Sequence, residues 1–208
     1  MIHFIYADAL SDHPVLQRTM FTDRARQFSE RLKWSVRVDD DGFERDEYDD
    51  MNPLYVIAEA NGRHSGSMRF LPTTGPIMVN DHFSHLAGDV RISSPLIWEC
   101  TRFCVAPDAP RTTSAALMLA AAELGRRAYL SHSVAVFDAR MVRVYRRMGW
   151  APDILGSDGT GRDRISVGLW AFDEAPVAAL AAQAGVEPAR ASDWYRTSFQ
   201  KPKAALAG

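Results

Sequence analysis

Residues 95–105, with the sequence PLIWECTRFCV, form an apolar run that carries two charged side chains, Glu99 and Arg102. A run of this length and composition predicts a buried β-strand. A charge inside such a strand costs free energy unless it has a partner. On a regular strand, side chains three positions apart face opposite sides of the sheet. Both charges therefore reach one site only if a bulge interrupts the strand.

Periodicity and turn signals place the other elements around this strand. They predict strands at 2–6, 54–60, 65–71, 131–137 and 165–172, and helices at 14–32, 112–130 and 139–148. Asn61-Gly62 indicates a hairpin turn, Asp138 is a good N-cap, and Gly149 is a typical C-terminal residue of a helix. The acidic stretch 39–50 has no usable periodicity and is expected to be a loop.

This order of elements predicts an α/β fold, a three-layer αβα sandwich around a mixed sheet. A length of 208 residues fits one domain with a tail. We expect a single domain over residues 1–173. Residues 174–208 form an Ala-rich extension with one short helix indicated, and are expected to be partly helical or loose.

Charge and cysteine content exclude several classes of protein. A net charge of -2 ranks nucleic-acid binding low, because dedicated binders are usually basic. The start of the chain has no basic targeting segment, and the longest helix-like apolar run, 115–122, is far short of a bilayer span. Cys100 and Cys104 lie four apart on the predicted strand, about 13 Å at ~3.3 Å per residue, which is too far for a disulfide. We expect a soluble cytoplasmic protein with reduced thiols.

Three groups of residues carry candidate chemistry. Glu99 and Arg102 have Arg69, Asp46 and Asp49 as candidate partners, and a structural ion-pair network is the plain alternative. Arginine and aromatics in the segment 24–34 suit a ligand with a carboxylate, a cation and a planar ring, although such aromatics are more often core. Six arginines at 126–127 and 140–147 form a basic face, which is either solvated or a dock for an acidic partner.

Other signals are weak. His82 and His85 lie three apart with no clear third ligand, so no metal site is expected. Gly159-Thr160-Gly161 lacks a third glycine and leads into a strand, so it is no dinucleotide loop. The chain has no nucleophile elbow and no phosphate-binding P-loop.

Together these segments resemble the acyl-homoserine-lactone synthases, the LuxI-type autoinducer synthases of bacterial quorum sensing. The similarity covers roughly residues 1–172. The segments that carry it are Arg24, Phe28 and Trp34; Glu44-Arg45-Asp46-Glu47-Tyr48-Asp49; Gly66-Ser67-Met68-Arg69 with Leu71-Pro72-Thr73-Thr74-Gly75-Pro76; Asp81-His82-Phe83; Trp98-Glu99-Cys100-Thr101-Arg102-Phe103; and Arg146-Arg147-Met148-Gly149-Trp150. One departure is that Met20-Phe21-Thr22-Asp23-Arg24 lacks the Arg-rich segment of most members.

The resemblance implies a fold like that of the GNAT acetyltransferases, with a V-splayed mixed sheet flanked by helices. It implies two substrates and no cofactor: S-adenosyl-L-methionine and an acyl thioester, carried by acyl carrier protein or by coenzyme A. The amine attacks the thioester to form an amide. The carboxylate then displaces methylthioadenosine and closes the lactone.

The resemblance also implies roles for particular residues. Glu99 is the expected general base, acting directly or through water, with its charge held by Arg69 or Arg102. The expected S-adenosylmethionine site contains Arg24, Phe28, Trp34, Asp46, Asp49 and Phe83. The expected acyl-chain pocket contains Trp98, Leu117, Ala121, Phe137, Met141 and Tyr145. The expected docking face for the acidic carrier protein contains Arg126, Arg127, Arg140, Arg143 and Arg147.

Two other functions stay open at this point. One is a GNAT-fold N-acyltransferase that uses acyl-coenzyme A, although residues 108–114 lack the glycines of that family's pyrophosphate loop. The other is a non-catalytic regulator that binds an acyl thioester or a carrier protein. Loss of Glu99 or of the Asp46 and Asp49 pair would have favoured the regulator, and all three residues are present.

Overall fold

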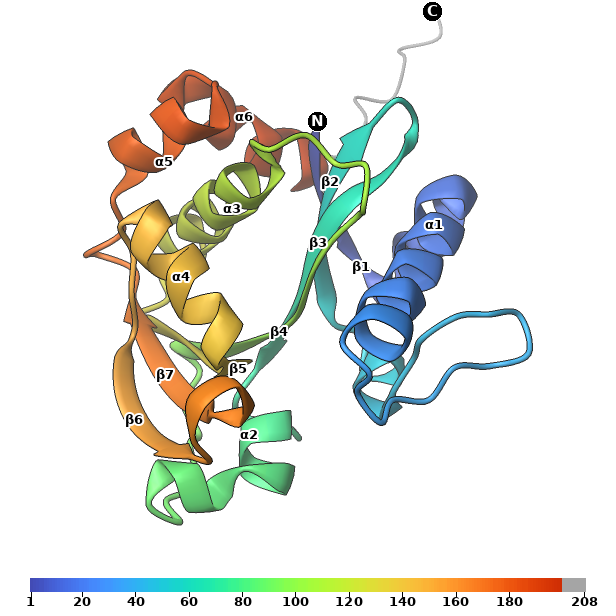
Figure 1. Cartoon of the computed structure of the whole chain (residues 1–208). Helices are drawn as coiled ribbons and strands as arrows, with labels where there is room; N and C mark the ends of the chain where they lie inside the picture. The colour runs from blue at the N-terminus through green and yellow to red at the C-terminus, as the bar shows by residue number, and fades with distance from the viewer. Residues whose placement is uncertain (200–208) are drawn as a thin grey trace, which may run out of the picture.

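The computed structural model describes residues 1–199, and its centre is a seven-stranded sheet with the order β1-β2-β3-β4-β5-β7-β6 (Figure 1). Adjacent strands are antiparallel except β4 and β5, which are parallel. The strands are β1 (Ile2–Tyr6), β2 (Leu54–Ala60), β3 (Arg63–Pro72), β4 (Ile97–Val105), β5 (His132–Asp138), β6 (Asp153–Asp158) and β7 (Ile165–Ala171).

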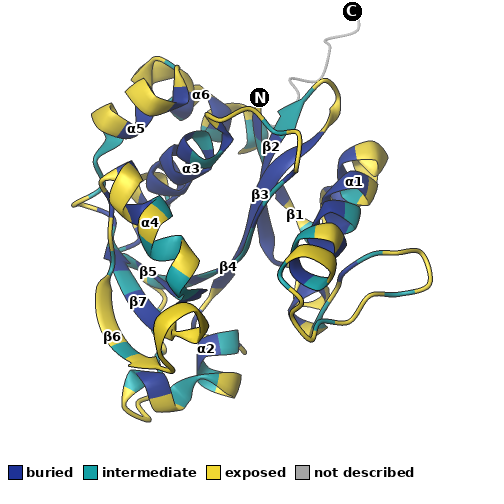
Figure 2. Ribbon diagram, in the orientation of Figure 1, coloured by how far each residue is buried: buried dark blue, intermediate teal, exposed yellow. Residues whose placement is uncertain are grey.

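Helices cover both faces of this sheet. One face packs against α3, α4, α5 and α6 around a large apolar core, which is dark blue in Figure 2. The other face packs against α1 near β1 and β2, and against α2 near β5 and β7. The predicted three-layer αβα sandwich is confirmed. The helices are α1 (Pro14–Arg24), α2 (Met78–His82), α3 (Thr113–Arg127), α4 (Ala139–Met148), α5 (Val177–Ala184) and α6 (Pro188–Phe199).

The parallel strands β4 and β5 pair over a short stretch and then diverge. Their register covers Ile97–Glu99 against His132–Val134 and goes no further. On the other edge of β4 the register against β3 shifts between Ser67 and Arg69, and Arg102 has φ +54°. This irregularity is a β-bulge next to Arg102, the kind of interruption that the sequence requires if Glu99 and Arg102 are to share a site.

Local signals in the sequence are confirmed at one hairpin turn and at both ends of α4. Asn61 and Gly62 both have positive φ, as a two-residue hairpin turn of type I′ requires. The side chain of Asp138 accepts hydrogen bonds from the backbone N–H groups of Arg140 and Met141, which caps α4. Gly149 ends α4 in the left-handed conformation.

Two predictions about elements need correction, and one strand has no counterpart in the sequence prediction. The helix predicted over 14–32 is α-helical to Arg24 and then a π-helix over Ala25–Arg31. The acidic stretch is not a plain loop, because a 3-10 helix spans Glu47–Asp50 and the carboxylates within it are held by arginines. Strand β6 was not predicted, since its residues are mostly exposed and give no apolar pattern.

The C-terminal segment contains two helices where the sequence indicated one. Both α5 and α6 pack against α3, and α6 also packs against β1. The backbone N–H of Phe4 donates to Ser198 Oγ at 3.0 Å, and the rings of Phe4 and Tyr195 make an edge contact. The part of the predicted extension beyond residue 199 lies outside the described residues. Within residues 1–199, no helix is both long and apolar enough to cross a bilayer.

Candidate functional site

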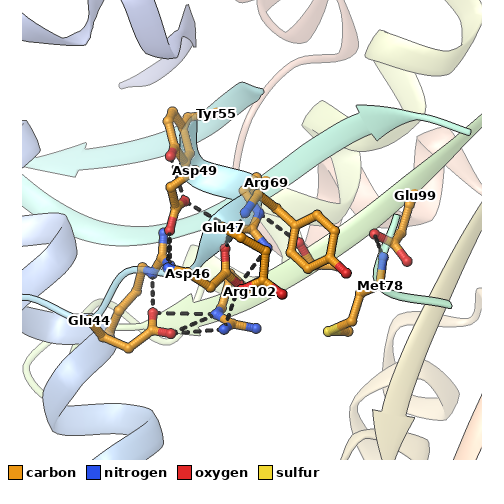
Figure 3. Close-up of polar contacts among 12 residues, drawn as sticks. Glu44, Asp46, Glu47, Asp49, Tyr55, Arg69, Met78, Glu99 and Arg102 are labelled. Atoms are coloured by element: carbon orange, nitrogen blue, oxygen red, sulfur yellow. Dashed lines mark hydrogen bonds and ion pairs between the residues drawn. The ribbon is translucent and has the colours of Figure 1, made fainter. Parts of the chain in front are cut away.

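Six charged side chains from four parts of the chain form one buried network (Figure 3). Three arginines face three carboxylates, so the formal charges balance. The carboxylate of Asp49 accepts hydrogen bonds from both terminal nitrogens of Arg24, at 2.9 and 2.8 Å. The network consists of Arg24 from α1, Glu44, Asp46 and Asp49 from the acidic segment, Arg69 from β3 and Arg102 from β4.

Glu44 and Asp46 link the arginines to one another. Glu44 accepts from Arg24 Nε at 2.6 Å and from Arg102 Nε at 3.0 Å. Asp46 accepts two hydrogen bonds from Arg69 and lies 2.7 Å from Arg102 Nη2. Burial alone would raise the pKa of the Asp46 carboxyl, but the hydrogen bond and charge of Arg69 and the charge of Arg102 lower it overall. Despite burial, the pKa of the Asp49 carboxyl is lowered as well, chiefly by Arg24, so Asp46 and Asp49 are ionised at neutral pH.

The network corrects one expectation about Arg24. Its guanidinium is 1% exposed and is occupied by Glu44 and Asp49. It therefore holds a carboxylate of the protein, and it does not border the cavity described below. Its pKa lies above the usual range, because the two carboxylates outweigh the effect of burial.

Glu99 lies apart from the network, which corrects the expectation that Arg69 or Arg102 pairs with it. Its Oε2 accepts from the backbone N–H of Met78 at 3.0 Å, and its Oε1 accepts from that of Val79 at 2.7 Å (Figure 3). These N–H groups begin α2 and have no partner within the helix. Burial raises the pKa of Glu99 to about 7, against the two hydrogen bonds and the charge of Arg69.

A cavity of about 680 Å³ runs between the diverging strands and the helices. At one end it is lined by the stacked rings of Phe28 and Trp34, and at the other by Phe137, Tyr145 and Trp170, which contact one another. Phe83 also lines the cavity. Residues 100–103 of β4 form the wall between these ends. The cavity is therefore one continuous space. Its first end, next to Phe28, Trp34 and Arg102, suits a polar ligand with a planar ring, and its second end suits an apolar ligand.

The polar end of the cavity has a ready-made stacking surface. The rings of Phe28 and Trp34 are parallel within 8° with centroids 5.2 Å apart. Phe28 is buried and Trp34 is 41% exposed. The guanidinium carbon of Arg102 lies 5.5 Å from the centroid of Phe28, which adds a cation–π contact. Of the residues predicted for the S-adenosylmethionine site, Phe28, Trp34 and Phe83 line the cavity, whereas Arg24, Asp46 and Asp49 lie behind it.

The apolar end contains four of the six residues predicted for an acyl chain. Ala121, Phe137, Met141 and Tyr145 line the cavity. Tyr145 makes edge contacts with Phe137 and with Trp170, at 5.3 and 4.8 Å between centroids. The other two predicted residues, Trp98 and Leu117, belong to the adjoining core and do not line the cavity.

The predicted basic face divides into two parts. Arg126 and Arg127 extend from the end of α3, where both pair with Glu123 and Arg126 also contacts Ser192 of α6. The other arginines lie on α4, where Arg140 pairs with Asp138. The division arises because α3 packs chiefly against α5 and α6. Arg140, Arg143 and Arg147 remain together as an exposed basic stripe on α4.

Neither cysteine forms a disulfide, as the spacing predicts. Burial raises the pKa of the Cys104 thiol to about 12, and burial also raises that of Cys100. Neither is therefore a thiolate at neutral pH. Among residues 1–199, no three side chains of His, Cys, Asp or Glu gather in a way that would hold a metal ion.

Sequence reasoning missed several residues that build this site. Glu44 is fully buried and pairs with two arginines, yet in the sequence it belongs to an acidic run that reads as solvated. Tyr55 donates to Asp49 at 2.6 Å, and Thr101 accepts from Arg69 Nε at 2.9 Å. The alternation of Glu44 and Asp46, two positions apart, is the signal that would have indicated Glu44.

A second buried hydrogen-bond chain fixes α1 against β3. His64 Nδ1 lies 2.8 Å from Asp23, and His64 Nε2 lies 3.0 Å from Ser67 Oγ. Burial lowers the pKa of His64, which is neutral at pH 7 and therefore donates to Asp23 and accepts from Ser67. Asp23 precedes Arg24 in the chain, so this contact steadies the helix that supplies Arg24 to the network.

Comparison with known proteins identifies the family. The family described as "Autoinducer synthase" matches residues 9–180. A protein of Rhizobium etli named acyl-homoserine-lactone synthase is 36% identical over 178 residues, which are 82% of this chain and 84% of that protein.

Solved structures show the same fold. The CoA-dependent acyl-homoserine lactone synthase MesI matches with a TM-score of 0.79 at 21% identity, over 90% of this chain and 96% of that one. BjaI, a CoA-dependent acyl-homoserine lactone synthase solved with SAM and isopentyl-CoA, matches with a TM-score of 0.78 at 26% identity. That match covers 92% of this chain and 98% of BjaI.

Proposed function

The chain belongs to the autoinducer synthase family and is an acyl-homoserine-lactone synthase, and we propose that the cavity described above holds both substrates of the reaction side by side. The observation that carries this proposal is the continuity of the cavity from Phe28 and Trp34, past residues 100–103, to the apolar end at Phe137 and Tyr145. S-adenosylmethionine occupies the first end and the acyl chain the second. Family membership decides against the N-acyltransferase and the non-catalytic regulator.

S-adenosylmethionine is a cation with a planar base, and the first end of the cavity suits both features. The Phe28 and Trp34 rings offer a face for the base or the sulfonium. Arg102 lines the cavity and its guanidinium carbon lies 5.5 Å from the centroid of Phe28, so we assign it to the substrate carboxylate. The other members of the charge network hold Arg102 in place and do not contact the ligand. Asp46 and Glu44 restrain it directly.

Amide formation requires the substrate amine in its neutral form. We assign the proton transfer to Glu99, whose pKa of about 7 suits a general base at neutral pH. Glu99 does not border the cavity and both its oxygens accept backbone hydrogen bonds. Of the two modes of action expected from the sequence, we therefore choose the second, in which Glu99 takes the proton through an intervening water.

The backbone edge of β4 beyond Glu99 is placed to receive the developing oxyanion. Among the described residues β5 pairs with β4 only as far as Glu99, so this edge of residues 100–103 faces the cavity without a strand partner. Its N–H groups are oriented by the sheet before substrate binds. The amine nitrogen bonds to the thioester carbon, the carbon–sulfur bond breaks, and the thiolate receives the proton that the amine lost.

Ring closure follows within the same space. The carboxylate oxygen of the methionine part attacks the carbon beside the sulfonium, and that carbon–sulfur bond breaks. Methylthioadenosine leaves as a neutral molecule and the lactone forms. No further proton transfer is needed, because the negative carboxylate and the positive sulfonium neutralise each other.

We propose acyl carrier protein as the acyl donor, on the strength of the exposed arginines of α4. Carrier proteins are acidic, and a basic stripe of Arg140, Arg143 and Arg147 beside the cavity would steer such a partner. Arg140 itself lines the cavity. Coenzyme A is the alternative, and one observation favours it: BjaI is described as CoA-dependent. We place the reaction in the cytoplasm, where the two free thiols would stay reduced.

Mass spectrometry of culture extracts tests the proposed function. Bacteria that express this chain should release an acyl-homoserine lactone, and the spectrum reads the acyl group directly. Cells that express the Glu99→Gln variant at the same level are the control and should release far less. Extracts of the wild-type culture without any such lactone would contradict the proposal.

A further inference from the structure

One buried hydroxyl inside the apolar end of the cavity has no hydrogen-bond partner. Ser133 lies on β5, is 5% exposed and lines the cavity. Within residues 1–199, Ser133 Oγ is a buried side-chain oxygen that has no hydrogen-bond partner. Buried polar groups are nearly always hydrogen-bonded, so an unpaired one that borders a cavity calls for a partner from outside the protein.

The surroundings of Ser133 offer it no partner. Its neighbour in the register on β4 is Trp98, and its neighbour on β7 is Trp170. The indole N–H of Trp170 donates to the carbonyl of Trp150, and that of Trp150 donates to the carbonyl of Ala171. The indole donors of Trp170 and Trp150 are therefore already used. The hydroxyl turns about a single side-chain bond, so it can follow a ligand.

Ser133 lies at the closed end of the space between the strands. It pairs with Trp98 where β4 and β5 are still joined, and Arg102 lies four residues further along β4. At ~3.3 Å per residue, residues 100–103 lie about 7 to 17 Å along the strand from this pair. The thioester carbon reacts near residues 100–103, so Ser133 meets the part of an acyl chain that is remote from the thioester.

We propose that Ser133 selects acyl groups that carry a hydrogen-bonding oxygen, as a hydroxyl or a keto group, in their distal part. This inference rests on the proposed function and specifies the class of its acyl substrate. A serine hydroxyl both donates and accepts, so it fits either kind of oxygen. A plain alkyl chain would leave the hydroxyl unpaired in an otherwise apolar pocket, and the site would bind that chain less well.

The test compares acyl donors of one chain length, each presented both on acyl carrier protein and on coenzyme A: a plain alkanoyl and a series with a single hydroxyl at successive carbons. The readout is the ratio of kcat/KM for each hydroxylated donor to that for the alkanoyl donor. Wild type should prefer hydroxyls in the distal half of the chain. In Ser133→Ala that preference should fall about tenfold, the effect of one hydrogen bond to a buried group. Ser133→Thr, which keeps a hydroxyl, should retain part of it.

Ser166→Ala is the matched control. Ser166 is also a buried serine, but its hydroxyl bonds to that of Ser157 and it does not line the cavity. Its variant should keep the wild-type preference. Ser133→Ala should fold normally, since it removes a hydroxyl that has no partner, and its melting temperature should equal or exceed that of wild type.

The outcomes separate this inference from the proposed function. Lactone formed with the same donor ratio in wild type and Ser133→Ala would overturn the inference and leave the function intact, as would a wild-type preference for plain alkanoyl donors. Either result is expected if the Ser133 hydroxyl binds only a water molecule and does not contact the acyl chain. If wild type forms no lactone from any donor, the proposed function fails, and quenching of tryptophan fluorescence by matched acyl-pantetheines then decides the inference. Equal affinity of wild type for the hydroxylated and plain ligands would overturn it.

Discussion

The carboxylate of Glu99 accepts a hydrogen bond from the backbone N–H of Val79 at 2.7 Å, and this contact joins the central strand β4 to the first turn of α2. A second bond from Met78 occupies the other oxygen. The same carboxylate therefore shapes the segment that supplies Met78, His82 and Phe83 to the cavity wall. Glu99 combines a proposed proton-transfer role with a structural one, and the two can be separated by experiment.

Glu99→Gln should lower kcat by about a hundredfold or more, as expected for loss of a general base. Affinity for S-adenosylmethionine should change little, because Glu99 does not border the cavity. Steady-state kinetics with a binding titration check this.

The pH profile distinguishes the role of Glu99 as a base from a structural role. For wild type, kcat/KM should rise as pH increases through about 7, where Glu99 loses its proton. That rise should be absent in Glu99→Gln. A variant with near-wild-type kcat would remove Glu99 from the reaction.

The raised pKa of Glu99 also predicts how stability depends on pH. The folded state binds this proton more tightly than the unfolded chain, whose Glu has a pKa of about 4.3. The stabilising contribution is therefore complete below the unfolded pKa and is lost as pH rises through about 7. Denaturant unfolding of wild type and Glu99→Gln at several pH values should show the difference between them changing across this window.

Glu44→Gln should lower the free energy of unfolding by about 3–5 kcal/mol, the usual cost of breaking a buried ion pair on one side. Glu44 is fully buried and serves both Arg24 and Arg102. Glu47→Gln is the control in the same segment. The Glu47 side chain is 59% exposed and lies 3.4 Å from His82, so its loss should have an effect below about 1 kcal/mol. Equal effects in urea unfolding would mean that the network does not hold this segment.

Trp34→Ala should weaken binding of S-adenosylmethionine about tenfold while leaving stability almost unchanged. The reason is that Trp34 is 41% exposed and stacks on Phe28 at the cavity wall. Phe28→Ala provides the contrast, since Phe28 is 3% exposed and its removal should also destabilise the fold by about 3–5 kcal/mol. Isothermal titration and thermal unfolding measure the two effects. Unchanged affinity in Trp34→Ala would place the ligand elsewhere.

Reversal of two α4 arginines tests the choice of donor. Arg143→Glu with Arg147→Glu should raise KM for acyl carrier protein, and wild-type turnover with that donor should fall with added salt. The control reverses Arg126 and Arg127, which pair with Glu123 at the end of α3. It introduces the same change of charge and should leave KM near wild type. Faster and less salt-sensitive turnover with acyl-coenzyme A would make coenzyme A the donor.

The sequence predicts the central strand from its apolar run, and it indicates that Glu99 and Arg102 share one site only if a bulge interrupts that strand. A bulge is present, but the two charges do not pair with each other. Arg102 has positive φ at that position, and the register against β3 shifts there. Apolar periodicity predicts α3, and capping residues predict both ends of α4. The edge strand β6 escapes such reasoning, since most of its residues face solvent.

Partners of buried charges are harder to predict than the charges themselves. Side-chain matching assigns Glu99 to an arginine, but its partners are backbone N–H groups, which every residue supplies. Glu44 is hidden in an acidic run and becomes recognisable when the fold brings two arginines to it. The unpaired state of Ser133 likewise depends on what surrounds it, which sequence alone does not give.

The most direct test of the account is to quantify both products made by the purified protein from S-adenosylmethionine and an acyl thioester. Acyl transfer and ring closure in one cavity predict an acyl-homoserine lactone and methylthioadenosine in equal molar amounts throughout the time course. Methylthioadenosine should not form when the acyl donor is omitted. Thioester consumed without methylthioadenosine, or methylthioadenosine released without a lactone, would contradict the account.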